Sequence, residues 1–169
     1  MGNNVVVITV LRFILLILAQ VTIFNQMNFM GFVNPLIYVL FFYWYPIRAN
    51  TSFFLMIGFL LGFFIDLFSD TMALHATASI TMAYARPFCM RLCFGNNFDI
   101  QTFTFKNTTR LQRITFLFML ILIQHTVFFT LEILSFSHIL LILKKILFTS
   151  FATLVLSVLL SSLFARAAD

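Results

Sequence analysis

Two glycines and two aspartates recur at intervals of four in the apolar stretch 56–75. They are Gly58, Gly62, Asp66 and Asp70. Residues four apart lie on one side of a helix, so the spacing predicts a stripe of bare backbone that leads to a carboxylate. An ionised carboxylate inside a bilayer costs up to about 2.5–3.5 kcal/mol unless protein or water surrounds it. The stripe therefore indicates a helix face that contacts protein and not lipid.

Acid–base catalysis by paired carboxylates is the most specific chemistry that this stretch could perform. Membrane aspartyl proteases need two carboxylates that face one another across separate helices and share a proton. Asp66 and Asp70 fall on consecutive turns of one helix, and no pattern brings Glu132 near them. The sequence contains no serine-nucleophile, zinc-protease or phosphate-loop motif. We therefore expect no enzymatic activity, and an aspartate-dependent membrane protease stays as a rival hypothesis.

A purely structural role is the main alternative to partner binding for these acids. In that role they would pair with bases at the same membrane surface, or Asp70 would cap the next helix. Asp66, Asp70 and His75 match no metal-ligand spacing, and Cys89 and Cys93 alone cannot complete a structural zinc site. We expect neither a metal nor a cofactor.

The deepest ionisable residue is His125, about 16 Å into an apolar stretch at 1.5 Å per helical residue. It stands beside Gln124. We expect a neutral imidazole that hydrogen-bonds a neighbouring helix, with a proton relay as the alternative.

The composition predicts an integral membrane protein. Hydrophobic residues make up 62% of the 169 residues, charged residues only 9%, and the mean hydropathy is +1.07. A soluble domain carries about 25% charged residues, so this chain could not cover a surface that faces water. The net charge of +5 is explained by the basic excess of cytoplasmic loops and not by nucleic-acid binding.

The apolar runs predict an all-α bundle of six transmembrane helices in one domain, 1–169. Each run is close to the ~20 residues that cross a bilayer. The predicted spans are 5–24, 32–47, 51–69, 72–90, 114–136 and 139–164. Pro35 stands near the start of the second span, where a helix tolerates proline.

The positions of the basic residues predict that both termini are cytoplasmic. The loop 91–113 and its flanks carry far more basic residues than any other connection, which is the positive-inside pattern. These residues are expected to contact the inner membrane surface, or alternatively a cytoplasmic protein. They are Arg86, Arg91, Lys106, Arg110 and Arg113.

The chain resembles the bacterial rod shape-determining protein MreD family. The resemblance rests on Gly-Phe-Leu-Leu-Gly-Phe-Phe-Ile-Asp at 58–66, Ala-Leu-His-Ala at 73–76, Pro35 and Gln20, and it covers about residues 15–84. One departure is Ala73, because members of the family usually have a glycine there. The second half of the chain agrees only in the number of spans, length and charge layout.

The resemblance implies a non-enzymatic scaffold subunit of the bacterial inner membrane. Such proteins bind MreC and support MreB-directed peptidoglycan synthesis by RodA and its transpeptidase partner, and thereby cell shape. Self-association is a further option. The family is also said to share the fold of the substrate-binding subunits of energy-coupling-factor transporters. On this reading a partner's membrane helix docks along a surface that includes Pro35, Gly58, Gly62, Asp66 and His75.

A substrate-binding subunit of a vitamin-type transporter is the alternative function. It would share six short spans and a modest length. It would also hold a ligand pocket that faces outward, in the region of His75 and Glu132.

Overall fold

The structure is a computed structural model that describes residues 3–27, 33–47, 50–95, 105, 108–133 and 139–166. The described residues are almost all helical and form no β-strand. The elements are α1 (Asn3–Thr22), the short 3-10 helix η1 (Phe24–Gln26), α2 (Val39–Trp44), α3 (Thr51–Ser69), α4 (Leu74–Phe94), α5 (Arg110–Ile133) and α6 (Ile139–Arg166). The all-α prediction is therefore confirmed for this part of the chain.

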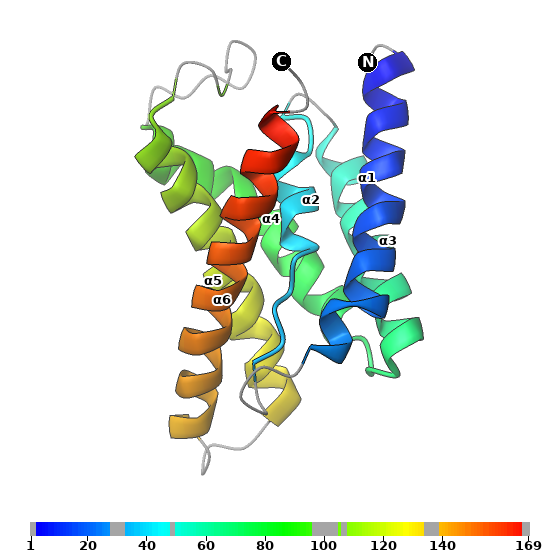
Figure 1. Cartoon of the computed structure of the whole chain (residues 1–169), viewed down its shortest axis with the longest axis vertical. Helices are drawn as coiled ribbons and strands as arrows, with labels where there is room; N and C mark the ends of the chain where they lie inside the picture. Colours follow the sequence, from blue (N-terminus) through cyan, green and yellow to red (C-terminus); the bar gives the residue numbers. More distant parts are fainter. Residues whose placement is uncertain are drawn as a thin grey trace.

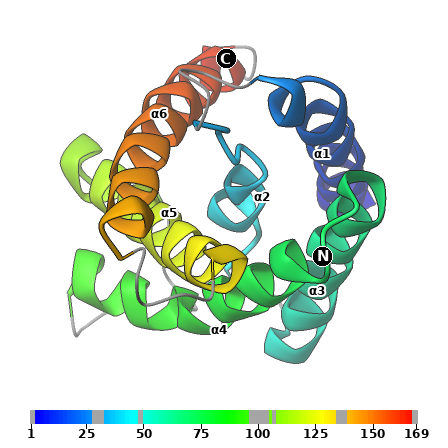
Figure 2. The same cartoon turned by 90° about the horizontal axis from the view of Figure 1, so that it is seen from below.

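The five longer helices form a ring around α2, as Figure 2 shows from one end of the bundle. Helices that follow one another from α3 to α6 pack side by side, and α1 packs against α3. Figure 1 shows that successive elements run in opposite directions, so α1 begins and α6 ends at the same end of the bundle. The arrangement places the carboxyl ends of α1, α3 and α5 together with the amino ends of α4 and α6.

The second predicted span is wrong as a transmembrane helix. Within the described part of that range, 33–47, the α-helix covers only Val39–Trp44, and six residues extend about 9 Å, far less than the ~30 Å of the hydrocarbon core. Pro35 disfavours the helical conformation of Asn34, so a helix is not expected to continue back through that residue. The residues from 35 to 42 are nonetheless all buried, at the centre of the ring. Apolarity here reflects burial in protein and not a helix in lipid.

Four of the described helices are long and apolar enough to cross a membrane, namely α1, α3, α5 and α6. The prediction of a membrane protein is confirmed at this level. The predicted span 51–69 coincides with α3, whereas α5 begins four residues before the predicted 114. Helix α4, which covers most of the predicted span 72–90, is not among the four, since its buried face carries polar residues such as His75, Ser79 and Arg86.

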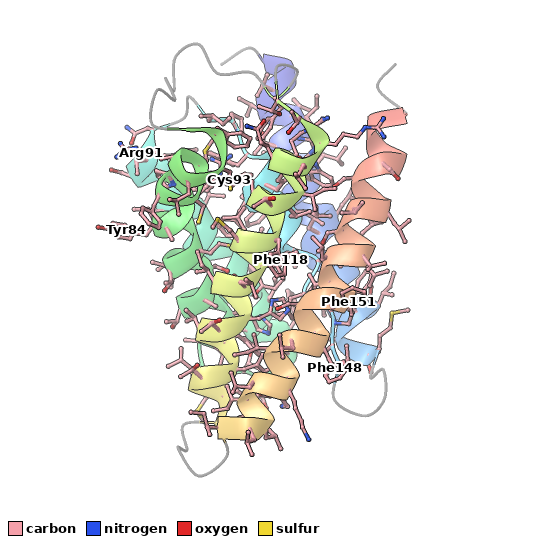
Figure 3. All side chains as sticks on the ribbon, turned by 90° about the vertical axis from the view of Figure 1, so that its left-hand side faces the viewer. Tyr84, Arg91, Cys93, Phe118, Phe148 and Phe151 are labelled. Atoms are coloured by element: carbon pink, nitrogen blue, oxygen red, sulfur yellow. The ribbon has the colours of Figure 1, made fainter. Side chains whose placement is uncertain are left out.

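Large apolar side chains cover the outside of the ring. Tyr84 on α4 and Phe151 on α6 are 77% and 68% exposed and project outward in Figure 3. Soluble proteins rarely expose such a continuous apolar surface, whereas a bilayer requires one. The polar side chains that could bind or react must therefore be sought inside the ring and at its ends.

Candidate functional site

The carboxylate of Asp66 holds the start of α4. Its two oxygens accept hydrogen bonds from the backbone N–H groups of His75 and Ala76, at 3.0 and 2.8 Å. The hydroxyl of Thr71 donates a third, at 2.5 Å. The first N–H groups of a helix have no partner within the helix and carry partial positive charge, so a carboxylate is well suited to them. These bonds link the end of α3 to the beginning of α4. The Asp66 side chain is buried between the two helices, with 5% of its surface exposed.

The first N–H groups of α4 are bound by Asp66 and not by Asp70, which the sequence offered as a possible cap of this helix. Asp70 does not cap α4; it follows the last residue of α3 in the left-handed conformation, with φ 53°. Its N–H donates to the carbonyl of Asp66 and closes the last turn of α3. The two aspartates therefore have different structural tasks at one helix connection.

Gly62 lets the backbones of α3 and α4 touch. A Cβ at this position would lie 2.5 Å from both Ala76 Cα and the His75 carbonyl oxygen. At Gly58 a Cβ would lie 2.9 Å from Phe42 Cε1, which is the far part of a side chain on α2. A side chain at position 62 would thus collide with backbone atoms of α4, whereas one at position 58 would meet a side-chain ring.

The predicted docking stripe is occupied by the chain itself. On α3, Gly58, Gly62 and Asp66 are buried against α4, and Gly58 also meets α2. His75 of α4 and Pro35, in the segment that precedes α2, are buried as well. A partner's helix cannot lie along these residues without displacing α4. The assignment of a partner-helix surface to them is therefore corrected: the seam is intramolecular. The inference that this stripe faces protein and not lipid holds.

A buried polar chain joins three elements next to this seam. The hydroxyl of Tyr38 lies 2.9 Å from His75 Nδ1, and the side-chain nitrogen of Gln124 donates to the same hydroxyl. Because the amide nitrogen can only donate, the hydroxyl hydrogen is free to point at Nδ1. Neutral His75 then carries its own hydrogen on Nε2. All three side chains are buried.

His125 bonds a neighbouring helix, as we expected. Its Nδ1 lies 2.8 Å from the carbonyl oxygen of Ile121, and its Nε2 lies 3.2 Å from the hydroxyl of Thr153 on α6. The Thr153 oxygen also accepts the backbone N–H of Leu36, at 3.2 Å. With Nδ1 donating to the carbonyl, Nε2 accepts from the hydroxyl, and every group has a partner.

The non-helical segment before α2 is held from two sides. Gln20 on α1 accepts the N–H of Ile37 at 2.9 Å and donates to the carbonyl of Pro35 at 3.2 Å, while Thr153 serves Leu36 from α6. Irregular backbone at membrane depth is tolerated only where protein satisfies its polar groups. Tyr38 and Thr153 were not named from the sequence, and Gln124 was named only as the neighbour of His125, although a polar residue in an apolar span is the signal that would have found them.

Arg86 is not at the membrane surface, which corrects its assignment to the basic patch. It is 4% exposed, donates to the carbonyl oxygen of Tyr45 at 2.6 Å, and lies 5.0 Å from the centre of the Phe54 ring. A cation stabilises the carboxyl end of a helix, here α2. Arg91 and Arg110 are exposed and Arg113 is half-buried, while Lys106 lies outside the described residues.

A pocket of about 370 Å³ opens at the end where α4 and α6 begin. Its polar lining includes Asn25, Asn34, Thr71 and His75, and Phe128 and Phe129 provide an apolar wall. At its edge Lys145 Nζ lies 2.9 Å from a carboxylate oxygen of Glu132 and 5.4 Å from the Phe129 ring centre. Sequence reasoning named His75 and Glu132 for an outward pocket, and the structure brings both to one pocket.

Comparison with known proteins leaves the family open. No family model, no curated protein and no solved structure matches the chain. Within the described residues, no three His, Cys, Asp or Glu side chains gather closely enough to hold a metal ion. The functional argument therefore rests on the geometry of the Asp66 seam, the central segment and the pocket.

Proposed function

We propose that this chain is a non-enzymatic scaffold subunit of the bacterial inner membrane, of the MreD type. In this role it binds MreC and supports MreB-directed peptidoglycan synthesis during elongation. One observation carries the proposal: the residues on which the resemblance rests contact one another. Gly62 and Asp66 contact Ala76 and the backbone of His75, and Gln20 bonds the carbonyl of Pro35. These contacts join α3 to α4 and α1 to the segment before α2, and so hold the bundle together.

The state of the polar groups favours a scaffold over an enzyme. Both oxygens of Asp66 are engaged by the cap of α4. Both ring nitrogens of His125 have partners, and Nδ1 of His75 is held by Tyr38. A general acid or base must be able to reach a proton of the substrate. Groups committed to holding helices together are poorly placed for that work.

A six-crossing topology with both termini in the cytoplasm fits this arrangement. Helices α3, α4, α5 and α6 alternate in direction, and the segment 33–47 runs back through the centre between the parallel helices α1 and α3 (Figure 1). The exposed Arg91 and Arg110 flank the connection between α4 and α5, at the end where α1 begins. The positive-inside rule assigns that end to the cytoplasm.

MreC must then use the outer surface of the ring, since the inner stripe is filled. A photoreactive amino acid at outer positions tests this in native membranes. Leu11, Phe68, Leu111 and Phe151 supply exposed positions on α1, α3, α5 and α6, and the fully buried Ile121 supplies the control. We expect a covalent adduct with MreC from at least one outer position and none from Ile121. A full set of negative outer positions, with MreC present in the membrane, would contradict the proposal.

A substrate-binding subunit of a small-molecule transporter is the second candidate. The pocket at the outer end, lined by His75 and Glu132, is the observation that favours it. Such a subunit should co-purify with an ATPase-linked coupling protein, whereas the scaffold should co-purify with MreC. Neighbouring genes for cell shape or for vitamin uptake would separate the two candidates in the same way.

A further inference from the structure

The pocket at the amino end of α4 has a volume suited to a small molecule. Ligand pockets range from about 300 to 1,000 Å³, and this one, at about 370 Å³, lies at the small end of that range. Its wall combines two phenylalanine rings with amide and hydroxyl side chains. Such a mixture of an apolar wall and a few convergent polar groups is typical of a binding site. The scaffold role uses the bonds of Thr71 and His75 to Asp66 but not the phenylalanine wall or the charged edge of the pocket.

The charges at the pocket edge define what it can hold. Among the described residues that line it, Glu132 and Lys145 are the formally charged ones, and they form a partly exposed ion pair. A ligand with a single charge would take one partner and leave the other unpaired in a partly enclosed site. A ligand that carries one charge of each sign replaces both halves of the pair. Exposed ion pairs contribute little to stability, so the exchange costs little.

We propose that this pocket binds a zwitterionic amino acid with an apolar side chain. Its carboxylate pairs with Lys145, its ammonium group pairs with Glu132, and its side chain packs on Phe128 and Phe129. The ammonium and carboxylate groups of an amino acid are bonded to the same carbon. A small separation of the Glu132 and Lys145 side chains therefore makes room for both groups between them. His75 lines the same pocket and keeps a hydrogen on Nε2, because Tyr38 donates to Nδ1. The site is independent of whether MreC binds the outer surface.

Calorimetric titration of the full chain in nanodiscs tests the proposal with three probes. L-Phenylalanine carries both charges, N-acetyl-L-phenylalanine lacks the ammonium group, and L-phenylalaninamide lacks the carboxylate. We expect L-phenylalanine to bind at least tenfold more tightly than either analogue and more tightly than L-serine. No binding of L-phenylalanine, or equal binding of the three phenylalanine probes, would overturn the proposal.

Variants at the ion pair locate the binding. Glu132→Gln and Lys145→Met should each weaken L-phenylalanine binding at least tenfold. Lys144→Met is the matched control, because Lys144 is the exposed neighbour that does not line the pocket. An unchanged melting temperature in all three variants shows that the bundle is intact. Retained affinity in both ion-pair variants, or an equal loss in Lys144→Met, would overturn the assignment of this pocket.

Discussion

The carboxylate of Asp66 accepts the backbone N–H of Ala76 at 2.8 Å, and Gly62 of the same helix leaves the space that Ala76 occupies, because a side chain at 62 would collide with it. An acidic residue and a glycine four positions apart thus perform one task. Gly62 brings the two helices together, and Asp66 supplies the acceptor that the start of α4 lacks. The acidic stripe of the sequence is a seam inside the molecule, so the partner that we propose would have to bind elsewhere.

Gly62→Ala should destabilise the protein strongly. Its Cβ would meet backbone atoms at 2.5 Å, so α3 and α4 must move apart. Overpacking of this kind costs about 1–3 kcal/mol, and more where backbone cannot yield. The melting temperature in detergent measures the loss. Gly58→Ala is the matched control, because there the Cβ meets the far part of the Phe42 ring, and we expect a smaller drop. Equal drops would contradict the backbone contact at Gly62.

Ala73→Gly should stabilise the protein. Ala73 directly precedes α4 with φ 58°, a left-handed conformation that costs a residue with a Cβ about 1–2 kcal/mol. Glycine adopts this conformation without strain, but it loses more conformational entropy on folding than alanine does. The net gain in the free energy of unfolding is about 0.5–1 kcal/mol. The glycine usual in the resembling family at this position has the same explanation. Ala85→Gly, inside α4, should instead destabilise by up to about 1 kcal/mol. Destabilisation by Ala73→Gly would refute the left-handed turn.

Thr153→Val should loosen the central segment. The change keeps the shape of the side chain but removes the acceptor for the Leu36 N–H and the partner of His125 Nε2. A buried donor left without a partner costs about 1–3 kcal/mol. Thr22→Val removes only an exposed bond to Leu18 of the same helix, so its melting temperature should hardly change. A neutral Thr153→Val variant would show that the segment is held in another way.

Cysteine labelling should report both the topology and the burial of Arg86. In a background with Cys89 and Cys93 replaced by alanine, Arg91→Cys should react with a membrane-impermeant maleimide only in inside-out vesicles. Met72→Cys, at the opposite end and 96% exposed, should react only in right-side-out vesicles. Arg86→Cys should stay unreactive from both sides until the protein is denatured.

The opposite labelling pattern at Arg91 and Met72 would reverse the orientation. Strong labelling of Arg86→Cys in the native membrane would place that position at the surface and contradict its contact with the Tyr45 carbonyl.

The predicted span of about 51–69 matches α3, because local signals and apolarity agree there. Asn50 accepts the Ser52 N–H at 2.9 Å as the N-cap, and the apolar run ends where Asp70 turns the chain. The second span failed because hydropathy reports burial and not conformation. Pro35 was the available warning, but only the tertiary contacts of Gln20 and Thr153 explain how a non-helical backbone is satisfied there.

The sequence predicts that this face of α3 contacts protein, but not which protein segment it contacts. Small and acidic residues at 58, 62 and 66 indicate that this face of α3 contacts protein, but spacing on one helix does not say whose protein fills it. Likewise, Arg86 counts as a basic residue near a cytoplasmic loop, and its sign alone cannot show that it bonds the Tyr45 carbonyl. Both outcomes depend on how helices distant in the sequence meet.

Asp66→Asn, compared with Asp66→Ala, tests the central claim most directly. Asparagine keeps one acceptor oxygen for the two N–H groups that Asp66 accepts, so one buried N–H loses its partner and we expect a loss of about 1–3 kcal/mol, with a larger loss for alanine, which leaves both N–H groups unpaired. The measurement is the melting temperature of each variant together with its recovery of MreC from native membranes. The account predicts that Asp66→Asn folds and retains MreC, while Asp66→Ala loses stability. An Asp66→Asn variant that melts like the wild type but loses all function would contradict it, because the charge itself would then be the functional group.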